Sequence, residues 1–131
     1  MALTATLRID NHSYYVMECD YEFSQEVDFT GRPSDRPRGG LINLVISAPD
    51  DNDLGFHEWM FDKNLTKDGE IELVINKDSI DKHRIISFKD AYCVRLYEYF
   101  NNNNPLQMYM KIGIMAGSII FGQDCEFNMI D

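Results

Sequence analysis

The residues of this chain that could catalyse a reaction or bind a metal are few and scattered. His12, His57 and His83 lie in different parts of the sequence, and no His-Glu-x-x-His motif, Cys-x-x-Cys pair or Asp-x-Asp-x-Asp-Gly loop is present. The sequence also lacks the Gly-x-Ser-x-Gly, P-loop and Gly-x-Gly-x-x-Gly motifs. These motifs usually provide the residues for acyl transfer, nucleotide hydrolysis and dinucleotide binding. The sequence therefore predicts no catalytic residue, no metal, no cofactor and no enzyme activity. It indicates an interaction protein.

Two short stretches could still be interpreted as chemical sites. Residues 50–53, Asp-Asp-Asn-Asp, offer oxygen ligands for Ca²⁺, but they precede an apolar run and fit a helix cap better. His57 and Glu58 could form an acid/base pair, but adjacent helix residues point in different directions. We therefore assign 50–53 to the start of a helix and give His57 and Glu58 no catalytic role.

The composition indicates one soluble globular domain with an acidic surface. The chain has 131 residues, 44% of them hydrophobic and 26% charged, and this length predicts a single domain over residues 1–131. Twelve Lys and Arg residues against 22 Asp and Glu residues give a net charge of −10. Because phosphate groups repel such a surface, we expect no nucleic-acid partner and no binding to anionic membranes.

Targeting segments and cysteines point to the cytoplasm. Residues 1–10 lack the basic and apolar regions of a secretory signal, and the apolar-rich stretch at 112–121 is far short of the ~20 residues of a spanning helix. We therefore expect a soluble protein without membrane insertion. Cys19, Cys93 and Cys125 are widely spaced, which predicts buried free thiols in a reducing compartment and no disulfide.

Most of the chain alternates with the two-residue period of β-strands. Residues 3–9 are apolar at odd positions, and Asp10-Asn11-His12 has turn chemistry, so a hairpin is predicted. Its second arm is a long strand at 15–29, apolar at odd positions and acidic at even ones. The acidic side chains are either solvated surface or a polar wall that faces a partner or a channel. They are Glu18, Asp20, Glu22, Glu26 and Asp28.

Four further strands are predicted at 41–47, 70–76, 84–98 and 106–121, with a turn at Lys67-Asp68-Gly69. The last strand is apolar on both faces, which is typical of a strand either sandwiched inside the fold or packed against another subunit. About six strands, three of them unusually long, close most simply into a small barrel. In 84–98 one face is expected to consist of Ile86, Phe88, Tyr92, Val94 and Leu96.

One short helix is predicted, at residues 54–61 after the cap candidates. Five of its eight residues are large and apolar, too many for one surface stripe on so short a helix. We therefore expect the helix to be clamped against the sheet, with Trp59 as its anchor. Gly55 makes the helix less stable by ~1 kcal/mol than alanine would, so the residue at which the helix starts is not fixed by the sequence.

An exposed loop rich in proline, glycine and arginine is predicted at residues 30–40. Three arginines give it local positive charge in an acidic chain. Because it lacks the interleaved aromatic residues that stack on bases, docking onto an acidic surface of another copy suits it better than nucleic acid. The docking residues are Gly31, Arg32, Pro33, Ser34, Asp35, Arg36, Pro37, Arg38 and Gly39.

At this loop the sequence resembles a known family. The block from Tyr21 to Gly40, which contains Ser24-Gln25-Glu26 and Arg36-Pro37-Arg38-Gly39-Gly40, is followed by Glu58-Trp59-Met60 and by Phe88 to Val94. These segments resemble the tube proteins of type VI secretion systems, the haemolysin-coregulated protein family (Hcp, also TssD), and more narrowly its Bacteroidetes branch. The likeness extends in order from the first hairpin to the last strand.

The resemblance implies a mainly β protein, a small β-barrel of two sheets with one short α-helix packed on its side, which assembles into hexameric rings. Such rings stack into an inner tube that a contractile sheath drives, with a spike at its tip, into a neighbouring cell. The implied partners are further copies of the chain, sheath and spike proteins, and effector cargo in the lumen. The family's extended loop, here about residues 29–39, makes ring-to-ring contacts. The family leaves the cytoplasm through the apparatus, without a signal peptide.

Two alternatives share part of this description. A tail-tube protein of a phage-like contractile particle would have the same barrel and rings, and only its neighbouring genes would distinguish it. A monomeric ligand-binding barrel would need a concave pocket lined by aromatic residues and would have the 15.2 kDa mass of one chain in solution.

Overall fold

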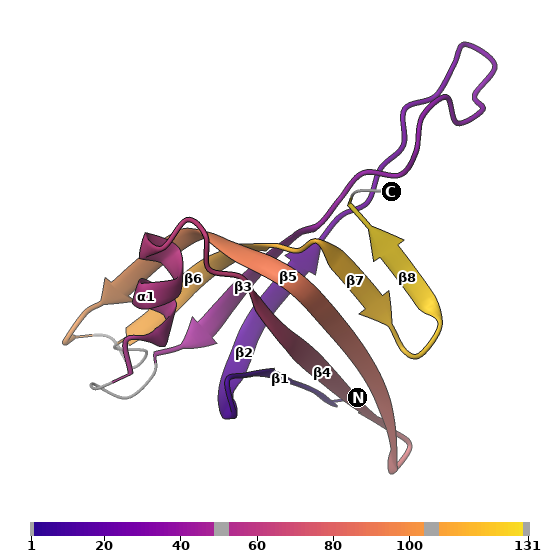
Figure 1. Cartoon of the computed structure of the whole chain (residues 1–131). Helices are drawn as coiled ribbons and strands as arrows, with labels where there is room; N and C mark the ends of the chain where they lie inside the picture. Colours follow the sequence, from indigo (N-terminus) through magenta and orange to yellow (C-terminus); the bar gives the residue numbers. More distant parts are fainter. Residues whose placement is uncertain (1, 49–52, 104–107, 130–131) are drawn as a thin grey trace.

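The computed structural model describes residues 2–48, 53–103 and 108–129 (Figure 1). They form eight strands rather than about six, because 106–121 contains two strands and because the pattern did not indicate the last one. The strands are β1 (Ala2–Ile9), β2 (His12–Tyr21), β3 (Leu41–Ser47), β4 (Lys67–Lys77), β5 (Ile80–Phe100), β6 (Met108–Met115), β7 (Ser118–Phe121) and β8 (Cys125–Asn128), and the helix is α1 (Gly55–Phe61).

The strands close into a small barrel of two sheets, which confirms the predicted fold class. Antiparallel neighbours follow one another in the order β4-β1-β2-β3-β6-β5, and β5 pairs with β4 to complete the ring. β2 and β5 each belong to both sheets. β7 and β8 extend from the first half of β5, and α1 packs on the side of the barrel against β5 (Figure 1).

Two tight turns set the strand register, one at each end of the paired strands β1 and β4. Asp10 and Asn11 have φ values of 53° and 63°, the left-handed pair of a two-residue hairpin turn, so the predicted first hairpin is confirmed. Asp78 and Ser79 form an equivalent turn between β4 and β5, with φ values of 56° and 63°. Asp, Asn and Ser tolerate such turns because their short polar side chains bond the local backbone.

β2 is shorter than predicted, and its inward face changes along its length. A bulge between Val16 and Glu18 adds one residue relative to β3. Before the bulge the even-numbered Val16 is buried, and after it the odd-numbered Cys19 packs toward the core. The prediction of one apolar odd face over 15–29 is therefore wrong: Tyr15 is 57% exposed, and the strand ends at Tyr21.

The predicted face of β5 is also wrong, because irregularities in the strand change which side chains point inward. Asp90 has a φ of 53°, and a further irregularity follows Cys93, so the inward side shifts twice along the strand. Ala91 and Cys93 are buried in consequence. Tyr92 and Val94, predicted to share a face with Ile86 and Phe88, lie outside and are 42% and 47% exposed.

The predicted turn at residues 67–69 is instead the start of β4. Between the pairs Lys67–Ala91 and Gly69–Phe88, β5 has one residue more than β4, and the Asp68 carboxylate accepts a hydrogen bond of 2.9 Å from the backbone N–H of Asp90. This bond joins the start of β4 to the bulge of β5. Gly69 is required here, because a Cβ would lie 2.8 Å from the carbonyl oxygen of Arg8.

The predicted long strand at 106–121 is divided at Ala116 and Gly117. β6 lies between β3 and the second half of β5, whereas β7 pairs with the first half of β5. At the crossing, the backbone N–H of Gly117 donates to the carbonyl oxygen of Lys89 at 3.0 Å. Along β6 the inward Met110, Ile112 and Ile114 are buried and the outward Tyr109, Lys111 and Met115 are only half-buried, while residues 106 and 107 lie outside the described residues.

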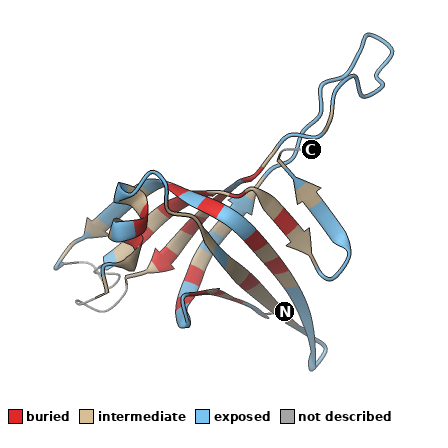
Figure 2. Ribbon diagram, viewed as in Figure 1, coloured by how far each residue is buried: buried red, intermediate tan, exposed pale blue. Residues whose placement is uncertain are grey.

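The core consists of the inward side chains of the barrel together with two residues of α1 (Figure 2). No polar or charged residue is buried in the part of the chain that the structure describes, so apolar burial stabilises the barrel. The largest fully buried side chains are Leu7, Ile42, Leu44, Ile46, Trp59, Ile71, Ile86, Phe88, Met110, Ile112, Ile114 and Ile119.

Candidate functional site

Residues 22–40 leave the barrel between β2 and β3 as one protruding loop (Figure 1). Its two limbs run antiparallel and are joined by isolated bridges, Ser24 with Arg38 and Val27 with Pro33. The backbone N–H of Ser24 donates to the carbonyl oxygen of Arg38 at 2.9 Å, and the reverse bond measures 2.7 Å. All side chains from 22 to 35 are exposed. The loop therefore begins at residue 22 rather than at 30, because β2 ends early.

The tip of the loop holds its shape by local hydrogen bonds. The Asp28 carboxylate accepts bonds from the Thr30 backbone N–H at 2.8 Å, the Thr30 hydroxyl at 2.6 Å and the Arg32 backbone N–H at 3.2 Å. These bonds, those from Thr30 first, lower the pKa of Asp28. Gly31 has a φ of 87°, which glycine adopts without steric cost. The turn leaves the Phe29 side chain 100% exposed.

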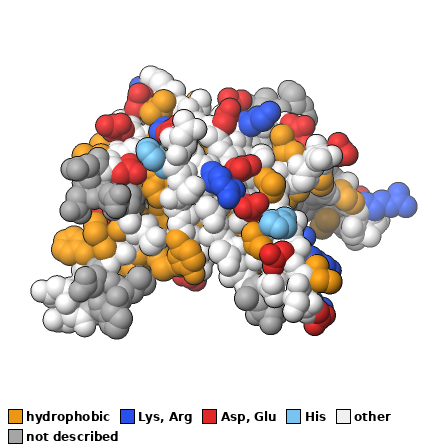
Figure 3. Space-filling view, turned by 90° about the horizontal axis from the view of Figure 1, so that it is seen from below, with side chains coloured by type: hydrophobic (Ala, Val, Ile, Leu, Met, Phe, Trp, Pro, Cys, Tyr) orange, Lys and Arg blue, Asp and Glu red, His pale blue; other side chains and the backbone are white. Residues whose placement is uncertain are grey.

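The three arginines of the loop have different surroundings. The Arg38 guanidinium pairs with the Asp35 carboxylate at 2.7 Å, which lowers the pKa of Asp35 and raises that of Arg38. Asp35 also accepts a bond of 2.8 Å from the backbone N–H of Arg36. The Arg32 guanidinium, by contrast, pairs with no carboxylate among the described residues. Figure 3 shows basic side chains at the far end of the loop, on the right.

An aromatic cluster holds the base of the loop. Phe23, on the first limb, packs against Phe127 of β8, Phe121 of β7 and Tyr21 of β2, with ring centroids 4.9, 5.9 and 6.0 Å apart. Gly39, on the second limb, crosses the same ring so closely that a Cβ would lie 2.4 Å from a Phe23 ring carbon. The cluster therefore sets the direction in which the loop leaves the barrel. Sequence reasoning missed it, because its members are far apart in the chain.

Trp59 is the most deeply buried residue of α1. Its side chain is 1% exposed, and the indole N–H donates to the carbonyl oxygen of Ala91 at 3.1 Å. The helix begins at Gly55, with Leu54 at the N-cap position, and the Asp53 carboxylate accepts a 3.0 Å bond from the Gly55 backbone N–H. The cap and Ca²⁺ candidates at 50–52 lie outside the described residues. The anchoring role of Trp59 stays a prediction.

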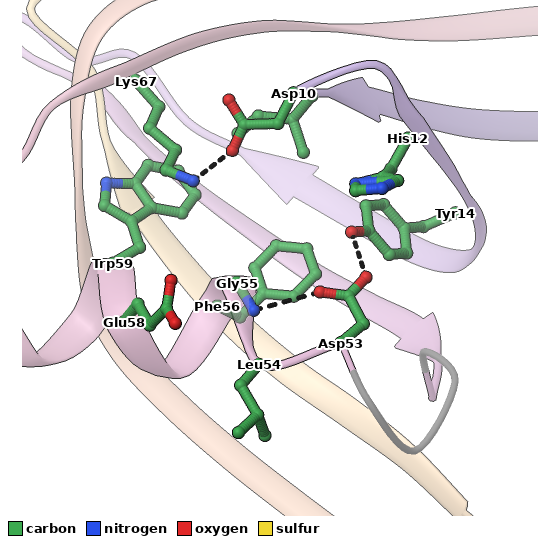
Figure 4. A pocket seen from close by; sticks show the side chains of 11 residues that line it. Asp10, His12, Tyr14, Asp53, Leu54, Gly55, Phe56, Glu58, Trp59 and Lys67 are labelled. Atoms are coloured by element: carbon green, nitrogen blue, oxygen red, sulfur yellow. Dashed lines mark hydrogen bonds and ion pairs between the residues drawn. The ribbon is translucent and has the colours of Figure 1, made fainter.

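A cavity of about 580 Å³, here called the α1 cavity, opens between α1 and the turn that joins β1 to β2 (Figure 4). The Tyr14 hydroxyl donates to Asp53 at 2.7 Å. Lys67 pairs with Asp10, and its ammonium lies 5.8 Å from the centre of the Trp59 ring. Burial and the bond to Asp53 raise the pKa of Tyr14, and the same bond lowers the pKa of Asp53. The lining residues are Ile9, Asp10, His12, Tyr14, Asp53, Leu54, Gly55, Phe56, Glu58, Trp59 and Lys67.

The histidines stay apart in the folded chain. His57 pairs with Glu98, His83 lies 3.5 Å from Glu72, and His12 packs against a tyrosine ring. The side chains of His57 and Glu58 thus point in different directions, His57 to Glu98 and Glu58 to the α1 cavity. Among residues 2–48, 53–103 and 108–129, no three His, Cys, Asp or Glu side chains are arranged to hold a metal ion.

The cysteines differ in exposure. Cys93 is buried and Cys19 is half-buried, and burial raises the pKa of both thiols, that of Cys19 to about 11. Cys125 is exposed, so the prediction of three buried thiols is wrong for this residue, which lies on the outermost strand β8. In the described ranges, no helix is long and apolar enough to cross a membrane.

Comparison with known proteins identifies the family. The family model described as "Hemolysin coregulated protein Hcp (TssD)" matches residues 1–129. The structure of Hcp1 from Flavobacterium johnsoniae is similar with a TM-score of 0.79 and 28% identity, and the match covers 95% of this chain and 98% of that one. This neighbour also supports the Bacteroidetes branch.

Two more distant structures show the same fold. Secreted protein Hcp3 from Pseudomonas aeruginosa matches with a TM-score of 0.66 and 10% identity over 99% of this chain and 100% of that one. A crystal structure titled as an Hcp protein matches with a TM-score of 0.79 and 12% identity over 99% of both chains. No curated protein matches the chain in sequence. Neither the phage-like nor the monomeric alternative gains support, and the chain belongs to the Hcp (TssD) family as a subunit of the type VI secretion tube.

Proposed function

We propose that the barrel and the loop of this tube subunit perform two separate assembly steps. The barrel closes six copies into a ring, and the loop of residues 22–40 joins each ring to the next. A sheath then drives the tube with its spike, and the lumen carries effectors. The chain leaves the cytoplasm through the apparatus and needs no signal peptide. The exposed acidic side chains of β2, Glu18 and Asp20, supply a polar wall for a partner or for the lumen.

The outer face of the barrel supports ring closure. Leu41 of β3 lies beside Met115 of β6, and Tyr92 of β5 lies on the other side of the same methionine. Tyr92 and Val94 are large, apolar and more than two-fifths exposed because the bulges in β5 turn them outward. Apolar groups that adjoin on a surface favour association with another chain. A ring needs a head-to-tail contact of this kind, with about 800 Å² buried per partner.

The single observation that carries the stacking role is the shape of the loop. It extends on the order of 20 Å from the barrel, given about 3.3 Å per extended residue. Its tip is ordered by its own hydrogen bonds and its base by the aromatic cluster, yet its side chains contribute nothing to the barrel core. A preformed segment whose side chains are mostly exposed is suited to a partner outside the chain. The predicted docking residues Gly31 to Gly39 belong to this segment.

Replacing the three arginines of the loop by serine tests the proposal. In the variant Arg32→Ser, Arg36→Ser, Arg38→Ser we expect rings of normal mass, six times the 15.2 kDa of one chain, but no stacked tubes and no secretion. Light scattering after size exclusion measures the ring, and negative-stain microscopy measures the tubes. Raised salt should weaken wild-type stacking in the same direction, because exposed charges are screened within about 8–10 Å.

A matched control removes the same charge from the barrel surface. Lys77, Lys82 and Lys89 are all exposed, and their triple replacement by serine should leave both rings and tubes intact. The assigned role of the loop is wrong if the arginine variant loses the ring itself, or if it stacks and secretes like wild type.

A further inference from the structure

We propose that the loop tip of one copy docks into the α1 cavity of a copy in the next ring, with Phe29 on the aromatic floor and Arg32 at the acidic rim. This inference rests on the proposed stacking function of the loop. It adds the surface that receives the loop and the side chains that make the contact.

The positions of the loop and the cavity fit a repeating contact between rings. In Figure 1 the loop extends to the upper right of the barrel, whereas α1 and the β1–β2 turn, which border the cavity, lie at the opposite side. A tube that grows by repeated addition of identical rings needs two different surfaces that complement each other, one at each end. The loop tip and the α1 cavity are such a pair, and their contact makes the rings stack head to tail.

The loop tip presents one apolar and one basic group. Phe29 is 100% exposed, and Val27 beside it is 58% exposed. The only carboxylate of the turn, that of Asp28, is engaged with Thr30 and with the backbone of Arg32, while the Arg32 guanidinium is unpaired among the described residues. Aromatic side chains and arginine are the groups that carry most binding energy at protein interfaces.

The α1 cavity presents the complementary groups. Phe56 and Trp59 contribute aromatic surface to its lining. Its rim holds three carboxylates against one ammonium: Asp10 is paired with Lys67, Asp53 is bonded to Tyr14 and to the backbone of α1, and Glu58 remains (Figure 4). Glu58 is exposed and has no partner in the described part of the chain, so it is the carboxylate free to accept a guanidinium.

The cavity is preformed, which lowers the cost of docking. The bonds from Tyr14 and from the Gly55 backbone hold Asp53 in place, and Trp59 is fixed by its bond to Ala91. Because both the tip and the cavity keep their shape without a partner, little conformational freedom is lost on contact. An arginine and a carboxylate that meet in a partly desolvated site also attract each other more strongly than an exposed pair.

A charge swap between the tip and the cavity tests the inference. The fraction of rings in tubes is measured by sedimentation and negative-stain microscopy for Arg32→Glu, for Glu58→Arg and for the double variant. We expect each single variant to reduce stacking at least tenfold, and the double variant to recover most of it. Phe29→Ala should also reduce stacking, whereas Phe29→Leu should retain more of it. Glu126→Arg, an equal charge change at an exposed position on β8, should stack like wild type.

The outcomes separate this inference from the function on which it rests. If the triple arginine variant of the loop still stacks, the stacking role of the loop fails. If that variant loses stacking while Glu58→Arg stacks like wild type, the loop acts but docks elsewhere, and only the α1 cavity is excluded. Loss of stacking in Glu126→Arg, or no recovery in the double variant, means that the Arg32 and Glu58 side chains do not meet.

Discussion

The barrel and the protruding loop reach their shapes by different interactions. In the described residues of the barrel, every fully buried side chain is apolar, and burial provides its stability. The loop buries almost nothing beyond its base and is shaped by hydrogen bonds such as those of Asp28 and Ser24. Substitutions in the barrel should therefore change the free energy of unfolding, whereas substitutions in the loop should change assembly and leave folding almost unaltered.

The largest expected effect is a loss of stability on removing a side chain that is buried between α1 and the barrel. Trp59→Ala removes a side chain that is 1% exposed, together with its bond to Ala91, and should lower the free energy of unfolding by ~3–5 kcal/mol. Chemical denaturation measures this loss. Phe61→Ala is the matched control in the same helix, because Phe61 is 80% exposed and its removal should cost less than about 0.5 kcal/mol. Unchanged stability of Trp59→Ala would mean that α1 is not anchored by this residue.

A substitution at the base of the loop should lower both the stability of the barrel and the stacking of rings, because the barrel and the loop meet there. Phe127→Ala removes the closest ring contact of Phe23, at 4.9 Å, from a half-buried position. We expect a loss of ~1–2 kcal/mol in stability and a larger loss of stacking, since the loop would no longer leave the barrel in one direction. Amide hydrogen exchange at residues 22–40 should rise while that of the barrel core does not. Tubes as abundant as those of wild type would show that the cluster does not position the loop.

The smallest effect is a pH dependence confined to the loop tip. Hydrogen bonds, from Thr30 first, lower the pKa of Asp28, so the stabilisation they give is fully present above the ordinary carboxylate pKa of about 3.9 and is lost as the pH falls through the lower folded value. The NMR shift of the Thr30 amide should therefore stay constant from pH 7 to about 4 and change only below that. Asp28→Asn, which keeps an acceptor without the charge, should remove this change. A titration centred well above pH 4 would contradict the assignment.

The predictable part of the fold is the part governed by local alternation. The first hairpin and the strand at 41–47 agree with the sequence pattern, because an alternating strand with one buried face needs no knowledge of its neighbours. The outward side chains of Tyr15, Tyr92 and Val94 were not predictable. The bulge of β5 before Ala91 turns Tyr92 and Val94 outward, and the bulge of β2 makes the inward face even-numbered before it, at Val16, and odd-numbered after it, because one inserted residue reverses the face of every residue that follows.

The candidate site was predictable only in part for a related reason. The Pro, Gly and Arg composition of residues 31–40 indicates an exposed loop by itself. The pairing of Arg38 with Asp35, and the absence of a carboxylate partner for Arg32 among the described residues, depend on how the turn folds. The aromatic cluster and the α1 cavity each bring together residues from distant strands, so their existence depends on the closure of the barrel rather than on any sequence window.

The separation of the two regions is tested most directly by a cryo-electron microscopy structure of assembled wild-type tubes. We expect six barrels in each ring, and residues 22–40 that cross the boundary between rings, with the tip against the opposite end of a barrel in the next ring. A loop that stays within its own ring, packed between neighbouring barrels or turned into the lumen, would contradict this expectation.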